Sequence, residues 1–206
     1  MPLQIQLCYI TDRHALSAEP LLPRLQSAVR AGVDLIQLRE KDLATGKLVE
    51  LATAAVEASR GSETRVIIND RLDIAMAVGA HGVHLRGQSV PVEVVRRHVG
   101  TDFLIGASCH SLNQATEAEA GGADYILLGP VFDTPSKRSY GPPLGLDKLS
   151  EVAHRVKIPV LALGGVTVEN VRLCLEAGAM GIAAIRLFQD CPSVKDRVVE
   201  LRAQVP

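Results

Sequence analysis

Cationic and amide side chains at the end of one apolar run could bind an anion. Gln37, Arg39 and Lys41 occupy every second position there, so an extended chain would point all three to one side. An arginine on an inner face needs an anionic partner, and its planar guanidinium binds phosphate well. The pattern therefore favours an anion site. The alternative is a solvated strand end in which Arg39 pairs with Glu40 or Asp42.

A carboxylate follows the next β-type run, Arg65–Asn69. Asp70 could bind a divalent cation, because Mg²⁺ prefers carboxylate and phosphate oxygens. The amide of Asn69 stands beside it. Asp is equally suited to cap a helix that contains Ile74 and Ala75. The spacing leaves both roles open.

A histidine ends another run, in the segment Ser108-Cys109-His110-Ser111. An imidazole exchanges protons near neutral pH, so His110 could act as an acid or base, with the Ser108 hydroxyl available for binding. The alternative is a structural histidine, with Ser111 as the N-cap of a helix. His84 lies inside a run and is the weaker candidate.

The connection over residues 131–145 is long and rich in Pro, Gly, Ser and Lys. A connection of this length in a compact domain is usually a lid or a binding loop. Thr134, Ser136 and Lys137 offer two hydroxyls and an ammonium to an anion over which the loop could close. A solvated turn is the alternative.

A glycine pair and an arginine end the last two runs. Gly164 and Gly165 offer bare backbone N–H groups, which form the usual phosphate site after the seventh and eighth strands of a barrel. Arg186 ends the eighth run and could pair with the same phosphate in a bidentate way. The two positions support each other.

The elements that would position these groups are short strands alternating with helices. Helical spacing lies between the β-rich runs, which predicts a parallel sheet. The runs are Leu7–Ile10, Asp34–Arg39, Arg65–Asn69, Val83–Arg86, Phe103–Ser108, Tyr125–Gly129, Pro159–Leu163 and Gly181–Arg186.

A recurring glycine-containing segment favours a closed barrel. Similar segments stand before the second, fourth, sixth and eighth runs, where a glycine would end a helix in the left-handed conformation. They begin at Ala31, Val78, Gly121 and Ala177. We therefore expect an α/β fold, a single (β/α)8 TIM barrel over residues 1–206. An open, doubly wound sheet is the alternative, although no GxGxxG motif follows the first run.

The composition excludes several classes of function. The chain has 206 residues, a net charge of -1 and 3% aromatic residues, without the basic clusters or stacking rings that nucleic acids require. No apolar run is long enough for a membrane span. Four cysteines lie far apart, so we expect reduced thiols in a cytoplasmic protein. The sequence leaves a homo-oligomer possible.

Read together, these segments resemble the thiamine phosphate synthase/TenI family. Each segment is modest alone, but the ordered set covers nearly the whole chain. The matching segments are Gln37–Lys41, Ile68–Arg71, Gly82–Leu85, Gly106–His110, Leu128–Lys137 and Leu163–Val166.

In synthases of this family, the resemblance implies that a hydroxymethylpyrimidine diphosphate and a thiazole phosphate form thiamine phosphate and diphosphate. Asp70 would bind Mg²⁺, and Gly165 would offer its backbone to the thiazole phosphate beside Thr134 and Ser136. The groups that would bind the diphosphate are Gln37, Arg39, Lys41, Asn69 and Lys137.

Two departures from the synthase pattern matter. Synthases typically carry a second Mg²⁺-binding Asp after the fourth strand, but the segment Leu85–Val90 has none, and the next carboxylate is Glu93. Losing an anionic ligand should weaken the binding of a hard cation. In addition, Arg186 replaces a serine, and this arginine could bind phosphate or fill space that a substrate needs.

TenI-type relatives lack that Asp and carry a Ser-x-His-Ser segment like Ser108 to Ser111. They isomerise a thiazole phosphate carboxylate without a metal, which would make His110 the acid or base. The departures favour this tautomerase, without a cofactor. The alternatives are a Mg²⁺-dependent synthase, which the retained Gln37, Arg39 and Lys41 favour, and a non-catalytic barrel that binds a phosphorylated ligand.

Overall fold

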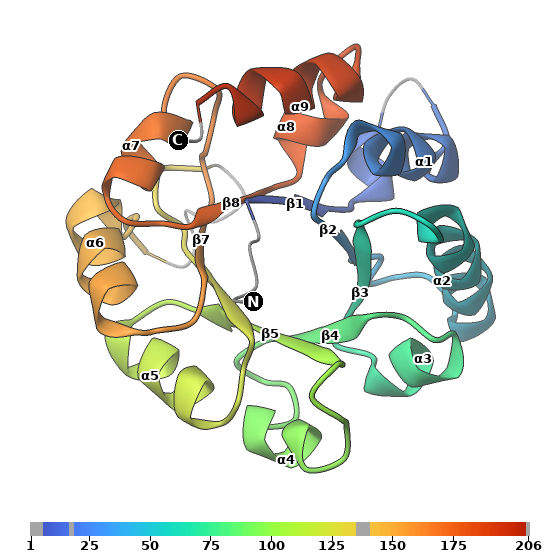
Figure 1. The fold of residues 1–206 in the computed structure, drawn as a ribbon, viewed down its shortest axis with the longest axis horizontal. Helices are drawn as coiled ribbons and strands as arrows, with labels where there is room; N and C mark the ends of the chain where they lie inside the picture. Colours follow the sequence, from blue (N-terminus) through green and yellow to red (C-terminus); the bar gives the residue numbers. More distant parts are fainter. Residues whose placement is uncertain (1–5, 17–18, 135–140, 205–206) are drawn as a thin grey trace.

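The computed structural model describes residues 6–16, 19–134 and 141–204. The described strands close into one parallel barrel in chain order (Figure 1). They are β1 (Leu7–Ile10), β2 (Leu35–Leu38), β3 (Arg65–Asn69), β4 (Gly82–Leu85), β5 (Leu104–Cys109), β6 (Tyr125–Leu128), β7 (Val160–Leu163) and β8 (Gly181–Ala184). Closure by pairing of β1 with β8 excludes the open sheet. The expected (β/α)8 barrel is confirmed.

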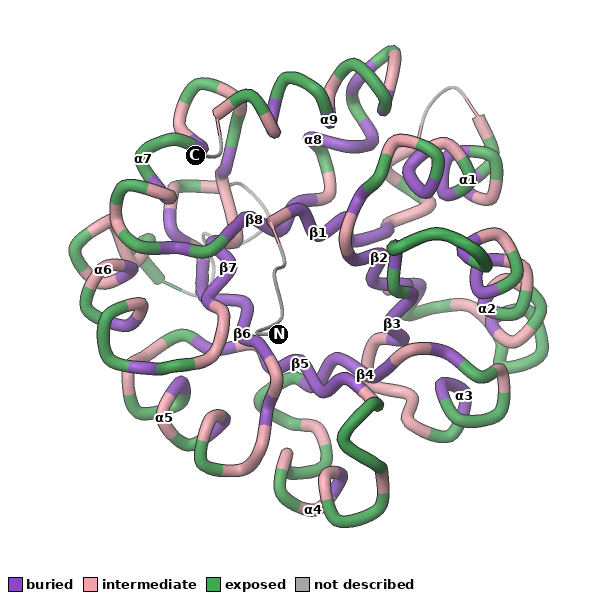
Figure 2. The backbone as a smooth tube through the Cα atoms, in the orientation of Figure 1, coloured by how far each residue is buried: buried purple, intermediate pink, exposed green. Residues whose placement is uncertain are grey.

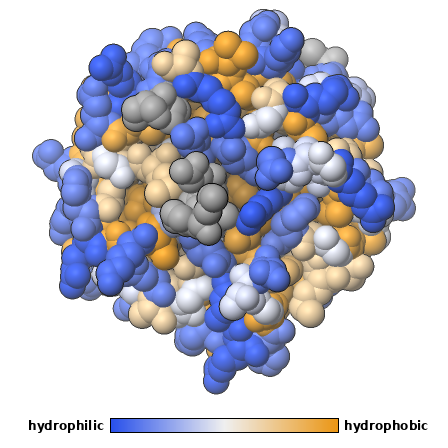
Figure 3. Space-filling view, in the orientation of Figure 1, coloured by the Kyte–Doolittle hydropathy of each residue, from blue (hydrophilic) through white to orange (hydrophobic). Residues whose placement is uncertain are grey.

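The helices form an outer ring around the barrel (Figure 1). They are the 3-10 turn η1 (Arg13–Ala15) and the α-helices α1 (Leu21–Ala31), α2 (Thr45–Ser59), α3 (Leu72–Ala77), α4 (Val92–Arg96), α5 (Leu112–Ala120), α6 (Gly145–Arg155), α7 (Val171–Glu176), α8 (Arg186–Gln189) and α9 (Val194–Arg202). None of these helices is long and apolar enough to span a bilayer. Hydrophilic residues dominate the face shown in Figure 3, with smaller apolar areas between them.

The strands are buried on both sides (Figure 2). A larger apolar cluster fills the space between the strands and the helices. A separate cluster fills the barrel, as branched side chains do in this fold. Its members are Cys8, Ile10, Leu35, Ile67, Leu104, Tyr125, Leu127, Leu161 and Ala183.

The glycines that follow alternate helices adopt the expected left-handed conformation. The φ angles are 79° at Gly32, 65° at Gly79, 92° at Gly122 and 97° at Gly178. Each of these residues ends a helix before an even-numbered strand, where a side chain would be strained. The chain can therefore turn directly from helix to strand at these four points.

Candidate active site

Polar side chains enter the barrel near the carboxyl ends of β2 and β3. The side-chain amide Nε2 of Gln37 donates to the side-chain Oδ1 of Asn69 over 2.9 Å. Gln37 is buried, and its own amide oxygen has no hydrogen-bond partner within the described residues. A buried acceptor without a partner carries a desolvation cost unless a ligand or water binds it. The pair can therefore receive a donor from the mouth of the barrel.

Arg39 does not form the ion pairs that a structural role would require. Glu40 and Asp42 both bind Arg13 instead, at 3.1 Å and 2.5 Å. A hydrogen bond from the Arg13 guanidinium holds the pKa of Asp42 below its usual range, and a hydrogen bond from His14 lowers this pKa by a smaller amount. The alternative in which Arg39 pairs with Glu40 or Asp42 is therefore wrong.

Asp70 directly follows β3 and is held in an unusual conformation. Its φ angle is 65°, and its backbone N–H donates to the carbonyl oxygen of His84 over 2.9 Å. The N-cap of α3 is Arg71, so the expectation that Asp70 caps this helix is wrong. A non-glycine residue with positive φ costs free energy, and such residues cluster at functional sites.

Both carboxylate oxygens of Asp70 already have donors. Arg86 donates to Oδ2 from Nε over 3.1 Å and also from Nη2, and the Ser89 hydroxyl donates to Oδ1. Partial burial opposes ionisation of Asp70, but these contacts outweigh it and lower the pKa of the carboxyl group. The carboxylate therefore stays charged and bound to a guanidinium.

A Mg²⁺ ion does not fit this arrangement. A hard cation needs several oxygen ligands, and the Asp70 oxygens are engaged by Arg86 and Ser89. Over the described ranges, no group of three or more His, Cys, Asp or Glu side chains could hold a metal ion. The sequence pattern showed the missing acid but did not identify Arg86 and Ser89 as the groups around Asp70. The available signal was the period of two that places Arg86 on the same side of β4 as His84.

His84 and Ser108 form a second polar pair inside the barrel. The distance from His84 Nε2 to Ser108 Oγ is 2.8 Å. Burial lowers the pKa of His84 to about 3, although the nearby Asp70 charge acts in the opposite direction. The imidazole is therefore neutral at physiological pH and orients the Ser108 hydroxyl. His84 lies inside β4, and for that reason the sequence made it a weaker candidate than His110.

His110 is exposed just after β5. Its Nδ1 lies 2.5 Å from the carbonyl oxygen of Gly129. A carbonyl oxygen only accepts, so Nδ1 carries the proton and Nε2 of the neutral ring carries the lone pair. Ser111 accepts a hydrogen bond from the Gln114 N–H and caps α5, as expected. No described residue forms a hydrogen bond with Nε2, so its lone pair could accept a proton.

Gly164 and Gly165 lie at the end of β7 with φ angles of 94° and 66°. A Cβ atom on Gly165 would lie 2.7 Å from the Asp133 carbonyl oxygen, and one on Gly164 would lie 2.6 Å from Pro130 Cβ. The glycines therefore allow the chain after β6 to approach β7. Phe132 N–H donates to the Gly164 carbonyl oxygen over 3.0 Å. This contact brings the described start of the long connection to the mouth of the barrel.

The structure connects the remaining predicted residues less directly with the mouth of the barrel. Thr134 ends the described part of the long connection, whereas Ser136 and Lys137 lie outside the described residues. Lys41 is exposed in the turn after β2. Arg186 does not end a strand, because β8 stops at Ala184; it is the exposed first residue of α8. The expected strand position of Arg186 is therefore wrong, and its phosphate contact stays a prediction.

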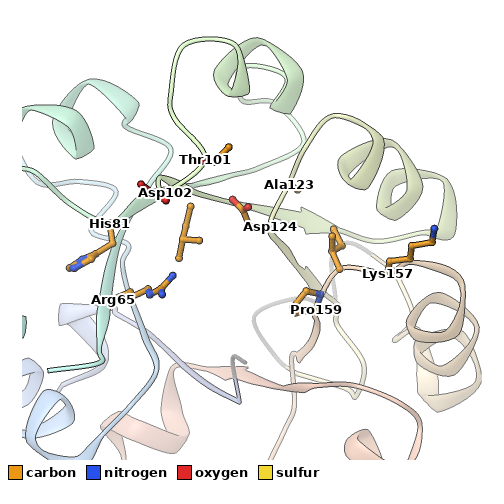
Figure 4. Close-up of a pocket in the computed structure, with 10 residues that line it drawn as sticks. Arg65, His81, Thr101, Asp102, Ala123, Asp124, Lys157 and Pro159 are labelled. Carbon is orange, nitrogen blue, oxygen red and sulfur yellow. The ribbon is translucent and has the colours of Figure 1, made fainter. Parts of the chain in front are cut away.

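A cavity of about 750 Å³ lies at the other end of the barrel (Figure 4). Its lining comes from the amino ends of the strands, including Arg65 at the start of β3 and Asp124 just before β6. In this fold the amino-terminal end contributes to stability, and the chemistry lies at the carboxyl-terminal end. None of the predicted site residues lines this cavity.

Comparison with known proteins identifies close similarity in sequence and structure. The family described as "Thiamine monophosphate synthase" matches residues 7–188. The "Putative thiamine-phosphate synthase" of Geobacter sulfurreducens is 44% identical, over 97% of this chain and 94% of its own length. The "Thiamine-phosphate synthase" of Roseiflexus castenholzii is 40% identical, over 89% of this chain and 80% of its own. The solved thiamine phosphate pyrophosphorylase of Pyrococcus furiosus is 34% identical, with a TM-score of 0.87, covering 98% of this chain and 95% of its own.

Proposed function

The chain belongs to the thiamine monophosphate synthase family, and on that premise we propose that this enzyme is a transferase that forms thiamine phosphate. A hydroxymethylpyrimidine diphosphate and a thiazole phosphate are the substrates. The bond from the pyrimidine methylene carbon to the diphosphate oxygen breaks, and its electron pair leaves with diphosphate. The thiazole ring nitrogen then donates its lone pair to the carbon, which forms the new C–N bond.

The paired amides and nearby cations at the ends of β2 and β3 carry this proposal. Gln37 and Asn69 are bonded to each other, and Arg39 is free of the acids beside it. In our proposal, Arg39 and Lys41 bind the diphosphate, while the amides orient it. These groups would stabilise the negative charge that develops on the leaving diphosphate. Such a reaction requires little proton transfer from the protein.

The thiazole phosphate would bind at the ends of β6 to β8. Backbone N–H groups near Gly164 and Gly165 offer donors where this fold usually binds phosphate. The hydroxyls of Thr134 and Ser136 and the ammonium of Lys137 belong to the same proposal, as does Arg186. A cytoplasmic location fits the four cysteines, which are free thiols.

A tautomerase is the second candidate, and one observation favours it. His110 presents an Nε2 lone pair beside a barrel mouth in which Asp70 is already paired with Arg86. Such a base could move a proton on a thiazole phosphate carboxylate without a metal. The departures from the synthase pattern favoured a tautomerase, but the relatives carry the name of the synthase and support that function instead. We therefore propose the synthase first.

A product assay tests the synthase directly. The purified chain is supplied with both substrates, with Mg²⁺ or with EDTA, and products are followed by mass. We expect thiamine phosphate; its absence under both conditions would reject the proposal.

A variant at the barrel mouth tests the assigned diphosphate contacts. Replacing Arg39 with alanine removes a charged donor, so kcat/KM should fall roughly 10- to 100-fold. Arg30→Ala on the outer helix α1 is the matched control and should keep the activity of the unchanged chain. An Arg39→Ala enzyme with the same kcat/KM as the control would contradict these contacts.

A further inference from the structure

The turn after β4 presents two donors to a carboxylate on the neighbouring strand. Ser89 N–H donates to the Arg86 carbonyl oxygen over 2.9 Å, and the Ser89 hydroxyl accepts the Arg86 N–H over 2.8 Å. This closed turn directs the Arg86 guanidinium and the Ser89 hydroxyl to Asp70. The Asp70 N–H is bonded to β4 in turn, through the His84 carbonyl oxygen. The side chains of Asp70, Arg86 and Ser89 therefore form one hydrogen-bonded cluster across the ends of β3 and β4.

The Arg86 guanidinium has N–H donors in addition to those that bind Asp70. Asp70 binds Nε and Nη2, and no contact to Nη1 is made by another described residue. The side chain of Arg86 is 43% exposed, against 24% for Asp70, so the guanidinium lies on the open side of the pair. A guanidinium stays protonated at any physiological pH and binds phosphate oxygens in a bidentate way.

We propose that Arg86, in place of a divalent cation, supplies positive charge for the diphosphate at the ends of β3 and β4. The inference rests on the proposed function for the identity of that anion. Asp70 acts as a positioning residue, because its carboxylate holds the guanidinium and Ser89 holds the carboxylate. A Mg²⁺ ion at this position would have to displace both donors from Asp70. Binding of diphosphate by this chain is therefore independent of Mg²⁺.

Calorimetry with inorganic diphosphate tests the inference without turnover. The full chain is titrated in EDTA and again in Mg²⁺, and we expect dissociation constants that agree within about threefold. Arg86→Ala should weaken binding in EDTA by at least about tenfold, which corresponds to about 1.4 kcal/mol. Arg172→Ala removes an exposed arginine that pairs with Glu176 on α7, and this control should bind like the unchanged chain.

Binding that requires Mg²⁺ in the unchanged chain would overturn the inference, whether or not the variants fold. Equal binding by Arg86→Ala and Arg172→Ala would overturn it as well. A double variant, Arg86→Gly with Ser89→Asp, places a second carboxylate near Asp70 and removes the guanidinium. Its diphosphate binding should become dependent on Mg²⁺. Because no product is formed, these results are separate from the success or failure of the synthase assay.

Discussion

At the scale of single residues, His84 shows how burial determines a protonation state. The ring is buried between strands, contacts Ser108 through Nε2 and lies 5.8 Å from the Tyr125 ring between centroids. Desolvation lowers its pKa to about 3. The neutral ring therefore serves as a fixed hydrogen-bonding group.

The lowered pKa of His84 predicts a pH dependence of stability. Between pH 6.5 and about 3 the unfolded chain binds a proton at this residue and the folded chain does not. The free energy of unfolding should therefore fall as the pH falls through this window, by up to about 1.4 kcal/mol per pH unit. Above pH 6.5 the contribution is fully present. Urea unfolding at pH 7 and pH 5 measures the difference.

A His84→Gln variant should lose this part of the pH dependence while keeping a side-chain amide that can hydrogen-bond the Ser108 hydroxyl. His98→Gln is the control, because His98 is exposed on the chain after α4. If the slope between pH 7 and pH 5 is the same in both variants, His84 is not the group that titrates.

His110 separates the two candidate reactions. His110→Asn keeps an N–H that can donate to the Gly129 carbonyl oxygen but removes the basic ring nitrogen. A synthase relies on charge stabilisation, so its kcat should change by less than about threefold, whereas a tautomerase that uses this base should lose roughly 100-fold or more. Steady-state kinetics of thiamine phosphate formation and of thiazole phosphate carboxylate isomerisation are measured for both proteins. A 100-fold loss of thiamine phosphate formation would contradict a synthase that relies on charge stabilisation without proton transfer by His110.

At the scale of elements, a buried arginine joins the first helix to the last ones. Arg24 on α1 donates to the carbonyl oxygens of Phe188 and Gln189, each over 2.9 Å, and of Cys191 over 2.5 Å. These carbonyls lie in and just after the short helix α8, where the helix end leaves acceptors without intrahelical donors. The arginine therefore completes the hydrogen bonding of α8 and closes the ring of helices beside β1 and β8.

Removal of this arginine should destabilise the chain strongly. Arg24→Met keeps the aliphatic volume but leaves buried carbonyl oxygens without donors, so we expect a loss of about 2–4 kcal/mol in the free energy of unfolding. Arg30→Ala lies on the same helix but is exposed, and should change stability by less than about 0.5 kcal/mol. Urea denaturation monitored by circular dichroism compares them. Similar midpoints for both variants would show that the Arg24 contacts contribute little.

At the scale of the whole molecule, the two ends of the barrel differ in chemistry. The carboxyl ends of the strands carry the amide pair, the Asp70 and Arg86 unit and the glycine pair. The amino ends surround the cavity of about 750 Å³ that contains no predicted site residue. This division is the one expected of a (β/α)8 enzyme.

The barrel was predictable from the sequence because its signals are local. Short apolar runs mark the strands, and β1 and β3 coincide with the predicted bounds. The position of Arg186 was wrong because the apolar run continues past Ala184 into the first turn of α8. Periodicity alone does not separate a strand end from a short buried helix.

The contact network of the site was less predictable than its composition. Asp70 was identified, but its pairing with Arg86 and Ser89 depends on a positive φ angle and on a turn of another strand. The positive φ angle leaves no local pattern in the sequence, and the period of two along β4 indicates only the side on which Arg86 lies. The same limit applies to His84, whose low pKa results from the packing around it.

A ³¹P NMR time course shows directly whether this chain forms thiamine phosphate. Both substrates are mixed with the chain in EDTA, and the signals of diphosphate and thiamine phosphate are followed together. We expect both products to rise in equal amounts, and omission of the thiazole phosphate to stop thiamine phosphate formation. No thiamine phosphate signal, either in EDTA or after Mg²⁺ is added, would contradict it.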